Sequence, residues 1–208
     1  MPSFISRFWS KEKKIINLLS NKATLCGGES ITAGLIASRI ASVSGASSCF
    51  KGGVVCYTND MKINLLGVDS NIIKKFSAVS PQTVLEMLKG VYAISASDFG
   101  YAISGYAGPS GNAGEVYIGL YHTFLQNKNE VAISLKSICK TIKFCKSIEQ
   151  ISLTDSGLAC FLFSCKFSGQ RNQIRKRAAN VTLQLIDKMV ASSVKATSNC
   201  IAKAFTDC

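Results

Sequence analysis

The chain has 208 residues, 47% of them hydrophobic and three of them proline, which fits one globular domain and excludes a disordered or linker-rich protein. No apolar run approaches the roughly 18 residues needed to cross a bilayer, and residues 1–14 lack the apolar core of a signal peptide, so we expect a cytoplasmic protein that does not bind a membrane. The net charge of +12 favours anionic partners, although the lysines are spread along the chain and a solvated basic surface is their simplest role.

The first part of the chain alternates between helical and strand patterns. Apolar residues at helical spacing indicate helices, and short apolar or β-branched runs bounded by glycine indicate strands. In chain order we predict a helix over 7–20, a strand ending at Gly27-Gly28, a helix from Glu29-Ser30 to about Ser42, a strand over 51–57, a helix over 60–66 capped by Thr58 and stopped by Gly67, a turn of helix over 69–76, a helix over 82–97 after the Ser80-Pro81 cap, and strands over 100–105 and 115–122.

The pattern loosens from Thr123 to Ser164, where polar, lysine-bearing segments separate apolar runs. Strands that alternate with helices imply an α/β fold, a three-layer α/β/α sandwich with a mixed, mostly parallel sheet. We expect a single domain over residues 1–195. Its last predicted elements are strands over 131–135 and 160–163 and a helix over about 172–194, followed by a flexible tail over 196–208.

Nine cysteines and a single histidine, His122, offer little to a metal ion. No Cys-x-x-Cys pair occurs, and the closest spacings are 139–145 and 160–165. Most of the cysteines lie among apolar neighbours, so we expect reduced thiols that serve as small core residues, and no metal. A Ser-His-Asp triad would depend on His122 alone, which makes it an unfavoured hypothesis.

Ser30 stands at the predicted junction between the first strand and the following helix. Backbone N–H groups at the start of a helix stabilise an oxyanion that forms beside such a serine. Serine also caps helices without any chemical role, and this stretch alone favours the cap. A serine nucleophile further needs a base.

Lys62 is the candidate base, because a neutral lysine can replace histidine. The ordinary lysine pKa of about 10.4 falls when the amine lies in the first turn of a helix among apolar neighbours. Tyr57, at the end of the preceding strand, is placed to bond to Ser30 or to Lys62, whereas Asp60 opposes the change by stabilising the charged amine. An exposed helical lysine without function is the commoner situation.

Two further segments suit an anionic ligand. The glycine-rich loop 105–111 can present backbone N–H groups to an anion, although it is not a Walker-type loop and an ordinary turn is the simpler interpretation. Arg171 and Arg175 lie four residues apart on one helix face, so both can meet one phosphate. A pair of surface arginines is the alternative.

Taken together, these segments resemble the C-terminal domain of the competence/damage-inducible protein A (CinA) family, whose stand-alone members include nicotinamide-nucleotide amidases. The ordered set covers roughly residues 10–122 and 166–192. The segments that carry the resemblance are Glu-Ser-Ile-Thr-Ala-Gly at 29–34, Gly-Val-Val-Cys-Tyr-Thr-Asn-Asp-Met-Lys at 53–62, Leu-Gly-Val at 66–68, Ala-Val-Ser at 78–80, Gly-Tyr-Ala-Gly-Pro at 105–109, and Phe-Ser-Gly-Gln-Arg at 167–171 with Ile174 and Arg175.

The resemblance implies hydrolysis of the carboxamide of nicotinamide mononucleotide to nicotinate mononucleotide and ammonia by a homodimer, without a metal or organic cofactor. By matched positions, Ser30 is the nucleophile, Lys62 is its base and Tyr57 is the hydrogen-bonding third member. The same match implies as substrate-binding residues Glu29, Thr32, Gly34, Asn59, Gly105, Ala107, Gly108, Arg171 and Arg175.

The chain departs from the family pattern in four places. Ala33 stands where glycine is common, Gln170 stands where aspartate is usual, and the loop after Gly111 is shorter. The stretch 123–165 is longer than the family's connection, and we expect it to extend the sheet, cover the pocket or contact a second subunit. Two other functions remain open: a catalytically silent member that binds a nucleotide or a protein, and, less favoured, a basic nucleic-acid-binding protein.

Overall fold

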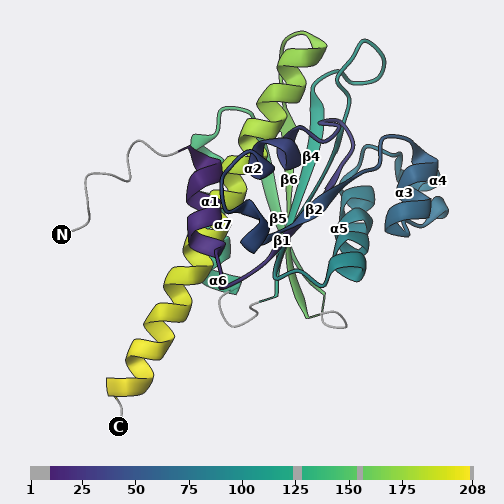
Figure 1. The fold of residues 1–208 in the computed structure, drawn as a ribbon. Coiled ribbons are helices and arrows are strands. Elements are labelled where there is room, and N and C mark those ends of the chain that lie inside the picture. The colour runs from purple at the N-terminus through teal and green to yellow at the C-terminus, as the bar shows by residue number, and fades with distance from the viewer. Residues whose placement is uncertain (1–9, 124–127, 154–156, 207–208) are drawn as a thin grey trace.

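The structure, a computed structural model, describes residues 10–123, 128–153 and 157–206. Figure 1 shows helices packed around a twisted central sheet. The elements in chain order are α1 (Lys11–Leu19), β1 (Leu25–Glu29), α2 (Leu35–Ala41), the short 3-10 helix η2 (Ala46–Ser48), β2 (Phe50–Val55), α3 (Asn59–Leu66), α4 (Ser70–Phe76), α5 (Pro81–Ser95), β3 (Phe99–Gly105), β4 (Glu115–His122), α6 (Lys128–Thr141), β5 (Cys145–Leu153), β6 (Leu158–Lys166) and α7 (Arg171–Thr206).

The described strands form one mixed sheet in the order β2-β1-β3-β4-β6-β5. Strand β1 pairs in parallel with β2 and with β3, whereas β3–β4, β4–β6 and β5–β6 are antiparallel. The prediction of an α/β fold with a mixed sheet is confirmed, but "mostly parallel" is wrong, since three of these five pairings are antiparallel. The reason is that β4 returns directly after β3 and that β5 and β6 add two more antiparallel strands.

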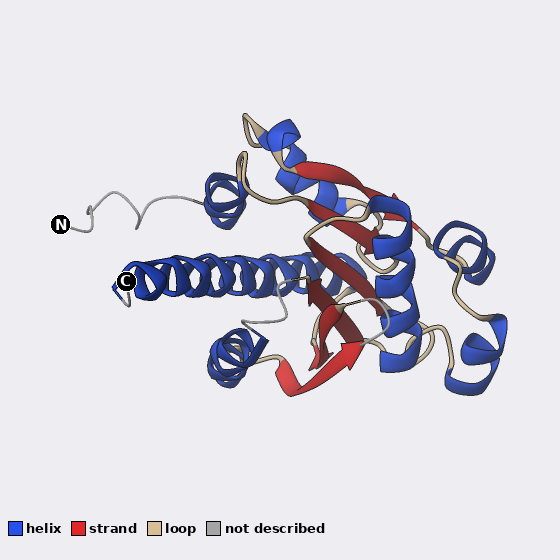
Figure 2. Cartoon of the chain, turned by 90° about the horizontal axis from the view of Figure 1, so that it is seen from below, coloured by secondary structure: helices blue, strands red, loops and turns tan. Residues whose placement is uncertain are grey.

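Helices cover both faces of this sheet, as Figure 2 shows from below. One core joins the sheet to α1, α2, α6 and α7, and a second core joins it to α3, α4 and α5. The predicted three-layer α/β/α sandwich is therefore correct. Each layer buries one apolar face, as this architecture requires.

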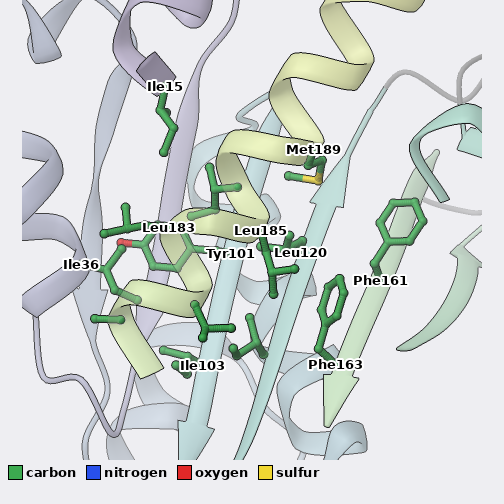
Figure 3. Packing of buried hydrophobic residues seen from close by; sticks show 14 of the residues in the cluster. Ile15, Ile36, Tyr101, Ile103, Leu120, Phe161, Phe163, Leu183, Leu185 and Met189 are labelled. Atoms are coloured by element: carbon green, nitrogen blue, oxygen red, sulfur yellow. The ribbon is translucent and has the colours of Figure 1, made fainter. Parts of the chain in front are cut away.

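The long helix α7 packs its apolar side against the middle of the sheet. Leu183, Leu185 and Met189 are fully buried and lie over side chains of β3, β4 and β6 in Figure 3. Burying a side chain of this size contributes about 1.5 to 3 kcal/mol. This packing fixes the start of α7, which carries Arg171, close to the carboxyl ends of the first three strands.

The predicted start and stop of α3 and the predicted start of α5 are confirmed. Thr58 caps α3 by accepting a hydrogen bond from the N–H of Met61, and Gly67 ends that helix in the left-handed region at φ 63°. Ser80 caps α5 by accepting from Thr83, with Pro81 in the first turn. These caps are local chemistry, which explains why the sequence reveals them.

The predictions after Thr123 are partly wrong. Residues 131–135 belong to helix α6, because Val131, Leu135 and Cys139 are buried at helical spacing while Ile133 is 70% exposed. Residues 160–163 lie in β6 as predicted, and 123–165 extend the sheet through β5 and β6. The closing helix runs to Thr206, so the tail expected over 196–208 is helical up to that residue.

One pair of cysteines contradicts the expectation of reduced thiols. Cys139, near the end of α6, forms a disulfide with Cys145 at the start of β5. The turn between the two elements brings these residues together, which their spacing alone did not reveal. The other cysteines with described side chains, Cys26, Cys49, Cys56, Cys160 and Cys165, are free and buried. Within the described ranges, no helix is long and apolar enough to cross a membrane.

Candidate active site

A cavity of about 190 Å³ lies where β1, β2 and β3 end, at the edge of the sheet where α/β proteins bind ligands. Of the part of 123–165 that the structure describes, no residue lines this cavity. The residues that line the cavity are Ser30, Ile31, Tyr57, Asn59, Lys62, Ala78, Val79, Ser104, Gly105, Tyr106, Ala107, Gly108, Ser110 and Arg171.

Ser30 and Lys62 meet on the floor of this cavity. The Lys62 Nζ lies 3.0 Å from the Ser30 Oγ, and the lysine is only 2% exposed. Its amine also donates to the carbonyl oxygens of Cys56, at 3.2 Å, and Tyr57, at 3.4 Å. The backbone N–H of Ser30 donates to the carbonyl oxygen of Ile103, which ties the serine to β3.

The environment of Lys62 favours its neutral form. Burial lowers the pKa of the Lys62 amine, and the neighbouring Cys56 opposes this change only in part. Asp60, which we expected to stabilise the charged amine, forms no ion pair with Lys62. A buried lysine with a lowered pKa beside a serine hydroxyl is the arrangement that a serine nucleophile needs for activation.

Ser30 lies in a turn and not in the first turn of a helix, which corrects the sequence prediction. Helix α2 begins at Leu35 after a left-handed cap at Gly34, so Ser30 does not cap it either. The carbonyl oxygen of Ser30 accepts from the N–H of Ala33, and the N–H of Ile31 makes no hydrogen bond within the described residues. The donor beside the serine is thus a turn N–H, which can take the place of the helix start.

Tyr57 and Arg171 form the rim of the cavity. Tyr57 is 49% exposed, and its hydroxyl accepts from the Arg171 Nη2 and not from Ser30 or Lys62. The Arg171 Nη1 donates to the carbonyl oxygen of Gly108 at 2.8 Å. The contact between Tyr57 and Lys62 is therefore made by the tyrosine's backbone carbonyl, which differs from the expected role of its phenol.

The glycine loop that connects β3 to β4 forms the opposite wall. Gly105, Ala107 and Gly108 line the cavity, as does Asn59 from α3. The loop is held by hydrogen bonds from the N–H of Tyr106 to Glu115 and from the N–H of Gly114 to Tyr106. The N–H groups of Ala107 and Gly108 make no hydrogen bond within the described residues, which leaves them for a ligand.

Comparison with known sequences shows the family of this chain. The model of the CinA C-terminal domain family matches residues 10–144. This chain belongs to that family. Similar curated proteins are a CinA-like protein of Endomicrobium trichonymphae (36% identical over 169 residues, 81% of this chain and 33% of the relative) and a CinA-like protein of Thermotoga neapolitana (34% over 178 residues, 85% and 36%). This chain thus spans about a third of the length of these relatives.

Solved structures of CinA proteins share this fold. The competence damage-inducible protein A of Klebsiella pneumoniae is 21% identical, with a TM-score of 0.67 over 88% of this chain and 98% of that one. The competence/damage inducible protein of Agrobacterium tumefaciens is 24% identical, with a TM-score of 0.65 over 91% and 97%. At these identities, the likeness concerns the fold.

Three residues expected to bind substrate in this CinA domain lie behind the cavity wall. Glu29 is fully buried, and its carboxylate accepts from the N–H groups of Ile36 and Ala37, at 3.2 and 2.7 Å, and from the Tyr101 hydroxyl. Thr32 is buried as well, and Gly34 forms the left-handed cap of α2. Glu29 therefore fixes the start of α2 and does not line the cavity.

Arg175 is separated from the cavity that Arg171 reaches. Its guanidinium donates to the carbonyl oxygens of Ile31 and Thr32, so it does not share a phosphate site with Arg171 as the sequence suggested. Gln170 stands at the start of α7, where its N–H donates to the side chain of Gln173. That bond satisfies the backbone N–H of the residue before the helix.

His122 lies at the opposite end of the sheet from Ser30. It pairs with Phe99, the first residue of β3, and its ring stacks on Phe161 at 5.8 Å between centroids. Burial lowers the pKa of His122 to about 4. A Ser-His pair is therefore excluded by position, and the described residues contain no group of three or more potential metal ligands.

Sequence reasoning did not single out Ser104 or Val79 as cavity residues. Ser104 is buried near the end of β3, where its hydroxyl donates to the carbonyl oxygen of Ala78 at 2.8 Å. This bond links β3 to the segment before α5, and residues of both segments line the cavity together with Ser30. The available signal was a serine within an otherwise apolar strand that ends at the same sheet edge.

Proposed function

We propose that this CinA domain hydrolyses the carboxamide of nicotinamide mononucleotide to nicotinate mononucleotide and ammonia. The observation that carries the proposal is the 3.0 Å contact between the buried Lys62 amine and the Ser30 hydroxyl inside a cavity. Family membership supports it, since stand-alone CinA proteins resembling this chain include nicotinamide-nucleotide amidases. A serine with a neutral lysine as base is chemically suited to acyl transfer from an amide.

The reaction proceeds through an acyl-enzyme. Neutral Lys62 takes the Ser30 proton as the Oγ attacks the carboxamide carbon, and the N–H of Ile31 stabilises the resulting oxyanion. The C–N bond then breaks while the Lys62 ammonium returns a proton to the departing nitrogen, which leaves as ammonia. Lys62 next takes a proton from a water molecule as the water oxygen attacks the ester carbon. The ester C–O bond then breaks, the Lys62 ammonium gives its proton to the departing Ser30 Oγ, and the pyridine carboxylic acid is released.

The cavity size suggests how the nucleotide lies. Its volume of about 190 Å³ is below the roughly 300 Å³ at which pockets for drug-sized ligands begin. The pyridine ring with its carboxamide therefore enters, and the ribose phosphate remains at the mouth. Arg171 is the cavity-lining arginine at that rim, and its fork geometry suits a phosphate.

The decisive test is ammonia release from nicotinamide mononucleotide by purified protein. We expect Ser30→Ala to lower kcat by at least about 10³-fold, because the covalent step is lost. The matched control is Ser42→Ala, which alters a serine at the end of α2 outside the cavity and is expected to leave kcat unchanged. Turnover by the wild type that survives Ser30→Ala would overturn the acyl-enzyme mechanism.

The role of Arg171 makes a separate prediction. Arg171→Ala should raise KM for nicotinamide mononucleotide by about tenfold or more, because a charge-assisted contact with the phosphate is lost, while kcat changes little. Nicotinamide riboside, which has no phosphate, serves as the matched substrate. If the variant loses the same factor with the riboside, Arg171 acts through Tyr57 or Gly108 and not on the phosphate.

The intact Ser30–Lys62 contact disfavours the silent-member alternative, although that alternative predicts nucleotide binding without ammonia release. The nucleic-acid alternative has only the charge of +12 in its favour, and binding that depends steeply on salt would support it. The homodimer and the cytoplasmic location stay predictions. Light scattering coupled to size-exclusion chromatography measures the first directly.

A further inference from the structure

We propose that Arg175 is a positioning residue that holds the turn after Ser30 in its reactive conformation without touching the substrate. The inference rests on the proposed role of Ser30 as the nucleophile. Arg175 was expected to bind a phosphate. In this proposal it instead holds the backbone next to the Ile31 N–H, the donor assigned to the oxyanion.

The contacts of Arg175 join the first turns of α7 to Ile31 and Thr32, which lie 144 and 143 positions away in the chain. The Nε donates to the carbonyl oxygen of Ile31 at 3.1 Å, and the Nη2 donates to that of Thr32 at 2.9 Å. A third bond runs from the Nη1 to the Asn172 side chain at 3.3 Å. One planar guanidinium thus holds two consecutive peptide groups, a geometry that the single amine of lysine cannot reproduce.

The turn itself has a conformation that needs support. Ala33 has φ 50° and Gly34 has φ 86°, and the left-handed region costs an alanine about 1 kcal/mol or more. Within the turn, the backbone bonds run from Ala33 to Ser30 and from Leu35 to Thr32. External contacts must therefore help to define its shape.

Two buried or partly buried charged groups supply that support from opposite ends. Glu29 accepts from the N–H groups that begin α2, and Arg175 donates to the carbonyl groups that precede it. The negative carboxylate thus contacts backbone N–H groups, and the positive guanidinium contacts backbone carbonyl oxygens. Each charge is stabilised by the opposite end of the backbone dipoles. The turn between Ser30 and Leu35 is consequently held at both sides.

Fixing these carbonyls also fixes the N–H groups of the turn. In a trans peptide, the C=O and the N–H lie on opposite sides of one rigid plane. The Ile31 carbonyl shares its plane with the N–H of Thr32, whereas the N–H of Ile31 shares the preceding plane with the Ser30 carbonyl. Because Arg175 holds the Ile31 carbonyl and the N–H of Ala33 holds the Ser30 carbonyl, rotation about the backbone bonds of Ile31 is restricted. This fixes the direction of the Ile31 N–H, which makes no hydrogen bond within the described chain. An oxyanion donor contributes most when it is already oriented before the reaction.

The test compares Arg175→Met and Arg175→Lys with the control Asn172→Ala, which removes only the third bond. Two quantities are measured: kcat and KM for nicotinamide mononucleotide, and the rate at which a fluorophosphonate modifies Ser30, followed by intact mass. We expect Arg175→Met to lower kcat and the modification rate together, by about 10²-fold, with KM changed less than about twofold. Arg175→Lys should fall between, added guanidinium ion should partly restore Arg175→Met, and Asn172→Ala should behave as wild type.

Other outcomes separate this inference from the proposed function. An increase in KM at unchanged kcat would make Arg175 a substrate-binding residue and overturn the inference. Wild-type modification rates in both arginine variants would also overturn it. If the wild type reacts with the fluorophosphonate at Ser30 but releases no ammonia, the proposed substrate is wrong, while the modification rates still decide the role of Arg175. Should Arg175→Met not fold, Arg175→Lys provides the same comparison.

Discussion

Replacing Lys62 with methionine is expected to abolish ammonia release and, at the same time, to stabilise the fold. Methionine fills a similar volume, but it cannot accept the Ser30 proton, so kcat should fall by about 10²- to 10⁴-fold. The lysine is 2% exposed and has no carboxylate partner among the described residues. Removing its buried amine should raise the free energy of unfolding by about 1 kcal/mol.

The pH dependence follows from the direction of the Lys62 pKa shift. Burial lowers the pKa of this amine in the folded state, so the unfolded chain binds more protons and stability rises with pH. The stability gain of Lys62→Met should therefore be largest below the folded pKa and disappear above the ordinary value of 10.5. For the wild type, kcat/KM should rise with pH along a limb whose midpoint lies below 10.5.

Urea denaturation at several pH values, together with ammonia release, measures both effects. Lys74→Met is the matched control, because Lys74 is an exposed lysine on the neighbouring helix α4. It should change neither activity nor the pH dependence of stability. A Lys62→Met variant that is less stable than the wild type at every pH would mean that the lysine's three hydrogen bonds outweigh the cost of burying it.

Gly90→Ala is expected to destabilise the fold by about 3 kcal/mol and to reduce activity. Gly90 lies in α5 against the end of α3, where an added Cβ would stand 1.9 Å from the carbonyl oxygen of Leu66. The backbone of α3 must then move, and α3 carries Lys62. The change should therefore lengthen the contact between Lys62 and Ser30 as well as weaken the packing.

Gly67→Ala is the matched control for that experiment. Gly67 ends the same helix at φ 63°, but an added Cβ would meet no atom within 4 Å. The expected cost is about 1 kcal/mol of backbone strain, with little effect on kcat. Urea denaturation and ammonia release distinguish the two variants. A Gly90→Ala protein as stable as wild type would contradict the prediction, because it would mean that α3 shifts without lowering the free energy of unfolding.

Much of the fold was predictable because its signals are local. Thr58, Gly67 and the Ser80-Pro81 pair each act within a few residues, so the sequence places α3 and α5 correctly. The meeting of Ser30 with Lys62 also followed, since both come after strands that end at one edge of the sheet.

The start of α2 was not predictable from its apolar spacing. Ile31, Leu35 and Ile36 fit a helical period, which suggested that Ser30 begins the helix. The structure instead places Ala33 and Gly34 at positive φ and delays the helix to Leu35. An alanine in this conformation gives no sequence signal, because the contacts that hold it come from elsewhere.

The roles of Glu29 and Arg175 depend on such distant contacts. Their charges suggested a ligand, whereas their partners are backbone groups that only the folded chain brings to them. The same reason applies to the Cys139–Cys145 disulfide, whose formation depends on the turn from α6 to β5. Sequence reasoning identified reactive residue types, but not which of them the fold uses internally.

The position of β5 at the far edge of the sheet has a consequence for how this protein can change. The cavity is lined by residues between 30 and 110 and by Arg171, whereas the described side chains of α6, β5 and β6 do not line it. Strand β5 lies three strands beyond β3, the last strand that ends at the cavity. Loops, tags or a whole accessory module can therefore be added at that edge, by evolution or by engineering, while Ser30 and Lys62 keep their places.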